Sequence, residues 1–243
     1  MGLIGKSDQI VLQIWSEPLQ KFRLAAEGHG AKQPPEALRE RVRTYCDPLP
    51  IWYVPLEQEA HDTSSFPFSA VTQRPMAMYH SWGSMNAWLR QIHGANRLYM
   101  SRAKGEAMGI AQDDWVWVES RNGRVKGQVT LMEGVNPDTV WTWNAIGKRA
   151  GAWMLTPDAA EAERGFLLNH VISEWLPAQT GPRLANADPI TGQAAWYDLR
   201  VNIKKCAPGE EGITAPHPSA LKPPPNMPEP PDILRFNAGD KKP

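Results

Sequence analysis

The sequence predicts a mainly β protein with helical insertions, a barrel followed by a polar tail. Several short segments have the composition of strands, because β-branched and aromatic residues cluster in them between turn signals. Only a few segments show helical periodicity. Ten of the 23 prolines follow Cys206, and a tail of that composition cannot form a compact core. A closed barrel is favoured because it leaves no strand edge unpaired.

The first 65 residues are predicted to be a lead-in segment. The stretch 9–15, QIVLQIW, has strand composition. A short helix is predicted next, because Ser16 can act as its N-cap and Pro18 lies in its first turn. Residues 33–62 contain five prolines, which predicts an irregular connecting segment.

Residues 66–206 are predicted to form the barrel domain. Its first strand is FPFSAVTQ, residues 66–73. An amphipathic helix is expected over 84–92, because its apolar residues have the spacing i, i+3, i+4, i+7 and should face a core. These residues are Met85, Trp88, Leu89 and Ile92. A second short helix is expected over 101–110, closing at Gly109.

The remaining barrel strands follow later in the chain. Residues 113–120 and 124–131 predict a hairpin, because Asn122-Gly123 between them is a strong turn signal. Further strands are expected over 138–145 and 196–205. Helices are expected from Thr156, which precedes a proline, and across 166–176, where apolar pairs recur at helical spacing. Residues 207–243 are predicted to be an extended or disordered proline-rich tail.

Charge and motifs exclude several function classes. Lys+Arg and Asp+Glu balance at 26 each, so no net field favours nucleic acid or an anionic membrane. Cys46 and Cys206 are in no metal-binding or redox spacing and are expected to be free thiols. The six histidines do not form a metal-ligand pattern, and no nucleophile or phosphate-loop motif is present. No catalytic or metal-ligating residue is therefore predicted.

The polar residues after the first barrel strand are the candidate binding site. They follow a buried strand and lead toward a helix N-terminus, where backbone N–H groups attract anions. An arginine among them offers a bidentate donor for phosphate. These residues are Thr72, Gln73, Arg74, His80, Ser81 and Asn86. An ordinary solvated loop is the alternative on chemistry alone.

Three motifs in order resemble the C-terminal domain of molybdopterin oxidoreductases, the dimethyl-sulfoxide reductase family. They are TQRPMAMYHSW (72–82), DDWVWVESRNGRVKGQV (113–129) and EGVNPDTVWTWNAIGKRAG (133–151). Later stretches, LNHVIS and DPITGQAAWYDLRVNIKK, are similar to the closing part of that domain. Within the family, the chain looks most like the catalytic subunit of cytoplasmic sulfite dehydrogenases, relatives of thiosulfate and polysulfide reductases.

The resemblance implies a fold and a set of cofactor contacts. The fold would be a six-stranded double-psi β-barrel that caps molybdopterin guanine dinucleotide. By position, the loop after the first strand would contact the cofactor, with Arg74 on a phosphate or pterin carbonyl. The further cofactor contacts implied by position are Asn144, Asn169, Ser173 and Tyr197.

The resemblance also implies what the chain works with. The cofactor would be molybdenum bis(molybdopterin guanine dinucleotide), shared with upstream domains that this chain lacks. We expect the chain alone to be inactive, as a truncated product or one piece of a split enzyme. The implied partners are those upstream domains together with an iron–sulfur electron-transfer subunit plus a membrane anchor subunit, with no nucleic acid. The expected location is the cytoplasm, at the inner face of the membrane through partner subunits.

Two alternatives stay open at this point. The barrel is also compatible with a non-catalytic interaction module that docks to a partner subunit through its proline-rich tail. Within the same family, the substrate is compatible with sulfite, thiosulfate, polysulfide or formate, because the residues that select a substrate lie mainly upstream.

Overall fold

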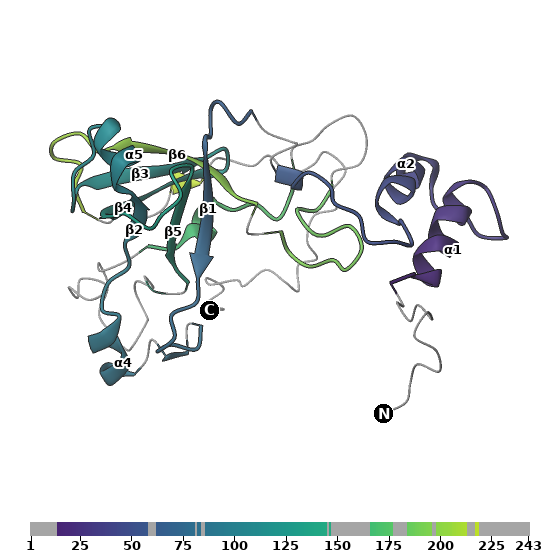
Figure 1. The fold of residues 1–243 in the computed structure, drawn as a ribbon, viewed down its shortest axis with the longest axis horizontal. Helices are drawn as coiled ribbons and strands as arrows, with labels where there is room; N and C mark the ends of the chain where they lie inside the picture. The colour runs from purple at the N-terminus through teal and green to yellow at the C-terminus, as the bar shows by residue number, and fades with distance from the viewer. Residues whose placement is uncertain are drawn as a thin grey trace, which may run out of the picture.

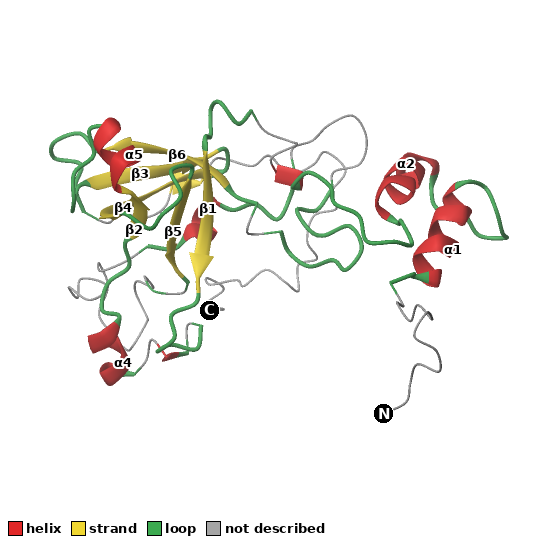
Figure 2. Cartoon of the chain, viewed as in Figure 1, coloured by secondary structure: helices red, strands yellow, loops and turns green. Residues whose placement is uncertain are grey.

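A closed barrel forms the body of the protein in the computed structural model. The structure describes residues 14–57, 62–80, 82–83, 86–144, 146, 166–176, 184–195, 198–212 and 217–218. Figure 1 shows the strands gathered in one body, with helices α1 and α2 apart from it. Long irregular segments join the two (Figure 2). No helix within these ranges is long and apolar enough to cross a membrane.

Six strands close the barrel and a seventh pairs outside it. Around the wall the order is β2-β5-β1-β6-β3-β4, and the pairing of β4 with β2 completes the circle. The strands are β1 (Phe68–Gln73), β2 (Leu98–Ser101), β3 (Trp115–Ser120), β4 (Gly123–Met132), β5 (Thr139–Trp143), β6 (Arg200–Lys205) and β7 (His217–Pro218). The predicted mainly β class and six-stranded barrel are confirmed. Strand β2 was missed by the sequence analysis, because its four residues carry no turn signals of their own.

The strand directions divide the barrel into two different ends. Strands β1 and β5 run parallel, with Gln73 opposite Trp143, so both end at the same place. The β3–β4 turn lies at that end as well, because Glu119 pairs with Asn202 near the start of β6. We call this end, where β1, β3 and β5 stop and β2, β4 and β6 start, the loop pole. The long segments 74–97 and 144–199 both begin and finish there.

Alternating side chains fill the barrel interior. Strand β5 alternates half-buried and buried positions along its length, as a strand with one face on a core should. The core consists largely of β-branched residues, which pack well on a pleated surface. Gly127 leaves room for the ring of Phe166, since a Cβ atom there would lie 2.6 Å from Phe166 Cε1. Phe166, which belongs to the segment before β6, therefore packs its ring into the barrel core beside Gly127.

Helices α1 (Glu17–Ala26) and α2 (Glu36–Tyr45) pack on each other in the lead-in segment. The first was predicted, with Ser16 at its N-cap. The second corrects the prediction of an irregular segment over 33–62. None of its residues is fully buried, and its half-buried apolar residues Leu38, Val42 and Tyr45 form only a short stripe directly after Pro34 and Pro35. Ion pairs three residues apart stabilise it instead, Arg39 with Glu36 at 3.0 Å and Arg43 with Glu40 at 2.8 Å.

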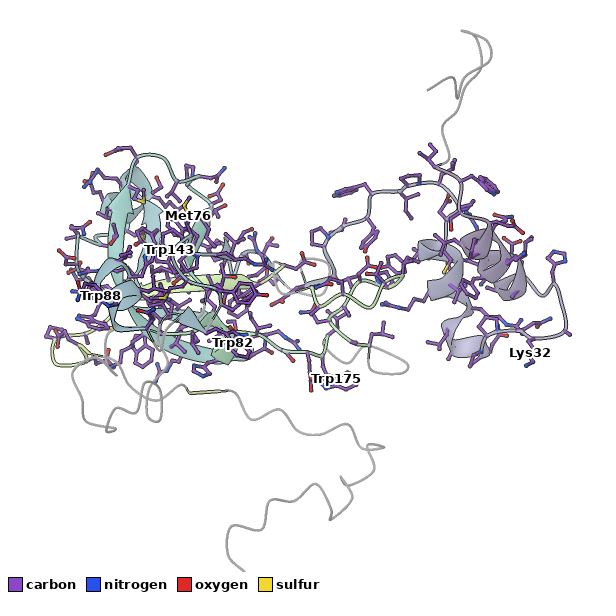
Figure 3. The ribbon with its side chains drawn as sticks, turned by 90° about the horizontal axis from the view of Figure 1, so that it is seen from below. Lys32, Met76, Trp82, Trp88, Trp143 and Trp175 are labelled. Carbon is purple, nitrogen blue, oxygen red and sulfur yellow. The ribbon has the colours of Figure 1, made fainter. Side chains whose placement is uncertain are left out.

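Helix α4 (Ala87–Ile92) forms where a helix was expected, but its apolar face is not in a core. Trp88 is 78% exposed and Ile92 is 64% exposed, and Figure 3 shows Trp88 at the edge of the barrel body. Amphipathic spacing predicts which residues share a face, and it does not predict what covers that face. Helix α5 (Arg102–Ala107) matches its prediction and closes with Gly109 at φ +71°.

The segment 166–176 corrects a predicted helix. Only one 3₁₀ turn forms, over Leu168–Val171, and the chain then becomes extended. The carbonyl of Val171 accepts hydrogen bonds from the Ser120 hydroxyl at 2.6 Å and the Asn122 amide at 3.3 Å. These bonds hold the segment on the β3–β4 turn, where a longer helix would lose them. The strand predicted over 9–15, except Ile14 and Trp15, and the helix from Thr156 lie outside the described residues.

The residues after β6 return along the outside of the barrel. Glu210 accepts a hydrogen bond from the indole N–H of Trp117 at 3.3 Å, and its carbonyl accepts one from the Lys126 ammonium. Arg124 lies 4.0 Å from the centre of the Trp117 ring. Strand β7 then pairs with the start of β4. Strand β6 therefore ends at the far end of the barrel, and β7 lies at the loop pole.

Candidate functional site

Parallel pairing of β1 and β5 brings four predicted site residues together at the loop pole. Thr72 lies opposite Thr142 in the register, and Gln73 lies opposite Trp143. The backbone N–H of Asn144 donates to the carbonyl of Gln73 at 2.7 Å, just before Arg74. Carboxyl ends of parallel strands are a common place for ligand binding in α/β sheets, and here they place polar side chains from two distant segments side by side.

Arg74 is an exposed cation that no neighbour neutralises within the described ranges. Several other arginines in the described ranges are paired, as Arg23 is with Asp47 at 2.6 Å and Arg102 is with Glu133 at 2.6 Å. No such contact of the Arg74 guanidinium occurs among the residues placed in the structure. An unpaired guanidinium retains all its donors for an external anion, and its planar fork matches phosphate.

Asn96 ties the loops of this pole together. Its Nδ2 donates to the carbonyls of Trp143 at 3.0 Å, Ile146 at 2.8 Å and Phe166 at 3.0 Å. Its Oδ1 accepts from the Thr142 hydroxyl at 2.7 Å and from the Trp143 N–H at 3.1 Å. The residue is 4% exposed. Sequence reasoning missed Asn96, because a single asparagine between a helix and a short strand carries no pattern.

The rest of the predicted loop is more mixed. His80 adopts φ +48°, which is uncommon for a residue other than glycine and marks a constrained turn. Its ring meets Tyr79 edge to face, with centroids 5.2 Å apart. The Asn86 side-chain oxygen accepts from the backbone N–H groups of Trp88 and Leu89, so Asn86 is the N-cap of α4. Ser81 and Tyr197, both predicted contacts, lie outside the described residues.

Asn169 and Ser173 line a pocket of about 390 Å³ beside this pole. The 3₁₀ turn places Asn169 on the surface, while Ser173 is buried and accepts from the Trp175 N–H at 3.1 Å. Asn186 lines the pocket from the opposite segment and donates to the Ser173 carbonyl at 3.2 Å. Figure 3 shows Trp175 on the stretch between the barrel and the two N-terminal helices. Asn186 was also missed, because nothing in the sequence pairs it with Ser173.

Two residues of the lead-in segment form hydrogen bonds to the segment that lines this pocket. Glu57 is 2% exposed and accepts from the Asn186 amide at 3.3 Å. Burial raises the pKa of Glu57 to about 7. Tyr53 donates to Asp188 at 2.5 Å, and this bond lowers the pKa of Asp188 to about 2. Each of these two hydrogen bonds joins residues more than 100 positions apart in the sequence, and together they hold the segment 186–188 in place.

Three buried oxygen atoms at this pole have no hydrogen-bond partner within the described part of the chain. They are Thr72 Oγ1, Asn122 Oδ1 and Asn186 Oδ1. Buried polar atoms are nearly always paired, so such atoms call for a ligand, water or ion. Together with the free Arg74 guanidinium, they fit a group that carries both N–H donors and anionic oxygens. A pterin joined to phosphates has this chemistry.

Comparison with known proteins gives the same assignment. Residues 68–185 match the family model described as "Molydopterin dinucleotide binding domain". Residues 68–185 belong to the molybdopterin dinucleotide-binding family. The matched range contains β1 to β5, the Asn96 contacts and most of the pocket-lining residues.

The relatives are much longer proteins. A sulfite dehydrogenase subunit from Allochromatium vinosum is 56% identical over 229 residues, which are 93% of this chain and 23% of that protein. Dopamine dehydroxylase of Eggerthella lenta is 26% identical over 84% of the chain and 18% of its own length. The thiosulfate reductase molybdopterin-containing subunit of Salmonella typhimurium is 28% identical over 35% of the chain and 11% of its own length.

One solved structure is also similar. Acetylene hydratase from Pelobacter acetylenicus aligns with a TM-score of 0.48 and 18% identity, over 66% of this chain and 22% of that chain. The chain spans less than a quarter of the length of the sulfite dehydrogenase subunit that it resembles.

Proposed function

We propose that this chain supplies the cofactor-capping domain of a molybdenum oxidoreductase that oxidises sulfite. The observation that carries the proposal is the 56% identity to the sulfite dehydrogenase subunit over 93% of the chain. The match to the thiosulfate reductase subunit is lower and shorter, at 28% over 35% of the chain, so it supports sulfite over thiosulfate. The proposed form of the cofactor is molybdenum bis(molybdopterin guanine dinucleotide).

The loop pole would hold the cofactor through three kinds of contact. Arg74 would neutralise a phosphate, because it is an exposed cation at this pole and has no partner among the described residues. Thr72 and Asn122 would satisfy their buried oxygens with N–H groups of a pterin. Asn169 and Ser173 would face a pterin from the pocket. When bound, the cofactor supplies two-electron redox chemistry, in which sulfite and water give sulfate, two protons and two electrons.

The domain's own part in that reaction would be to bind, orient and exclude water. Fixed donors and acceptors in a buried setting act more strongly than in water and need no rearrangement. The Asn96 contacts suit this part, since they fix the carbonyl groups of Trp143 at the end of β5 and of Ile146 and Phe166 in the following segment.

The proposed partners are the catalytic domains that make up the rest of such an enzyme, with an iron–sulfur electron-transfer subunit plus a membrane anchor subunit. The sulfite dehydrogenase relative is named as one subunit of its enzyme, which supports an assembly of several chains. We place the protein in the cytoplasm, at the inner face of the membrane through its partners.

Cofactor capture tests the proposal. The chain would be co-expressed with the remaining domains of the related sulfite dehydrogenase protein, and the purified complex assayed for molybdenum and released guanine nucleotide. Stoichiometric metal is expected, with a large loss in Arg74→Ala. The matched control is Arg102→Ala, an arginine at the far end of the barrel, which should retain the metal. A folded complex that contains no metal with the wild-type chain would refute the proposal.

A further inference from the structure

A buried carboxyl group in the lead-in segment contacts the pocket wall from outside the family match. Glu57 precedes residues 68–185 and is 2% exposed. Its Oε2 accepts from Asn186 Nδ2 at 3.3 Å, and the same Nδ2 donates to the Ser173 carbonyl at 3.2 Å. Asn186 and Ser173 both line the pocket. Glu57 therefore acts on the pocket through the orientation of one amide.

The charged groups around Glu57 come from several parts of the chain. Arg121 in the β3–β4 turn favours the ionised carboxylate, and so does a backbone N–H bond from Arg200. Asp198, just before β6, repels it, and burial raises the pKa of Asp198 as well. Asp188 lies two residues beyond Asn186 and is bound by Tyr53. Burial is the largest influence, and the pKa of Glu57 reaches about 7.

The two charge states of Glu57 make different hydrogen bonds. An ionised carboxylate only accepts, so it keeps the Nδ2 of Asn186 turned toward itself. A protonated carboxyl group gains a donor and loses acceptor strength. It can then satisfy Asn186 Oδ1, a buried oxygen without a partner among the described residues, if the amide turns over. Turning the amide exchanges donor and acceptor beside Ser173.

We propose that Glu57 is a proton-dependent positioning residue: when ionised it fixes the Asn186 amide so that the pocket accepts a pterin, and protonation releases that arrangement. The inference rests on the proposed function, because it takes the pocket to be the place of a pterin. It assigns a role to a residue outside the matched range 68–185, and it makes the affinity for pterin depend on pH. Pterin binding should in turn release the proton from Glu57, since linkage is reciprocal.

The expected effect on affinity follows from the ionised fraction. With a pKa of about 7, roughly three quarters of Glu57 is ionised at pH 7.5 and roughly one thirtieth at pH 5.5. Because only the ionised form is competent, the apparent affinity for pterin should fall about 20-fold between these values.

Binding of free pterin to the full chain measures this dependence. Pterin is fluorescent and stays mostly uncharged across the range from pH 5.5 to 7.5, so its own charge contributes little to the result. The wild type should lose about 20-fold in affinity on acidification, and Glu57→Gln should show no such loss. Asp198→Asn is the matched control: the dependence should remain, with its midpoint moved to lower pH, because one repelling charge is removed.

A second readout follows the amide without any ligand. The side-chain amide resonances of Asn186 can be assigned from an Asn186→Ala spectrum and followed against pH by NMR. They should titrate near pH 7 in the wild type and stay constant in Glu57→Gln. Constant resonances in the folded wild-type chain would overturn the inference, and so would a pterin affinity that does not change with pH or is absent.

These outcomes are separable from the proposed function. An amide that does not titrate, in a chain that still captures molybdenum through Arg74, would reject the role of Glu57 alone. A titrating amide in a chain that captures no molybdenum would reject the proposed function and leave the Glu57–Asn186 coupling intact.

Discussion

Replacing Asn96 by alanine should destabilise the barrel more than any neighbouring polar substitution. The side chain makes five hydrogen bonds from a position that is 4% exposed. Its removal leaves the Thr142 hydroxyl, which is 0% exposed, and the loop carbonyls without their partner. Each buried polar group left unpaired costs about 1–3 kcal/mol, and water can reach some of them, so we expect a loss of about 3 kcal/mol.

Urea unfolding followed by tryptophan fluorescence measures this loss, since the chain has 11 tryptophans. The matched control is Asn144→Ala. Its residue is also an asparagine at the loop pole, but its hydrogen bond to Gln73 is made by the backbone. The control should change stability by less than about 0.5 kcal/mol. Equal effects of the two substitutions, or an Asn96→Ala protein as stable as the wild type, would refute the reasoning.

Three further substitutions have expected results. Glu57→Gln should stabilise the chain by about 3 kcal/mol at pH 8 and hardly at pH 5. The reason is that folding raises the pKa of Glu57 from 4.5 to about 7, so wild-type stability falls as the pH rises through that range. Urea titrations at both pH values check it. Gly127→Ala should cost about 1–3 kcal/mol, because the new Cβ would lie 2.6 Å from Phe166, while Gly134→Ala, with no atom within 4 Å, should be neutral. Tyr53→Phe should raise the pKa of Asp188 from about 2, seen as a higher midpoint in a carboxyl NMR titration. The stability that this low pKa provides is present above pH 4 and lost as the pH falls toward 2, so the two proteins should converge in acid.

Local patterns predicted the wall of the barrel well. The Asn122-Gly123 turn and the alternation in β5 act over a few residues, so a single sequence contains them. Elements without such a signal were missed or misjudged. Helix α2 has no fully buried residue and directly follows two prolines, so its short apolar stripe gave a weak signal. The 3₁₀ turn at Leu168–Val171 is fixed by hydrogen bonds from Ser120 and Asn122, about 50 residues away.

In the candidate site, too, residues with a local sequence signal could be named in advance and residues without one could not. The residues after β1 could be named as candidates because they directly follow a recognisable strand, and the Arg74 guanidinium has the charge and shape that suit a phosphate. Asn96, Asn186 and Glu57 could not, because their importance depends on partners 13 to 129 residues away. The sequence contains each residue but not the distance between them. The exposed face of α4 was misjudged for a related reason, since periodicity does not identify the covering surface.

The placement of long segments at one end of the barrel has a consequence for how the domain tolerates change. At the far end, the connection between β4 and β5 is short and mostly exposed, and a Cβ atom added at Gly134 within it would meet no atom of a non-adjacent residue within 4 Å. A foreign peptide or reporter domain inserted there would extend away from the wall hydrogen bonds and from every candidate ligand contact. The two ends can therefore be altered independently, and the far end is the natural attachment point for labels that follow assembly without disturbing it.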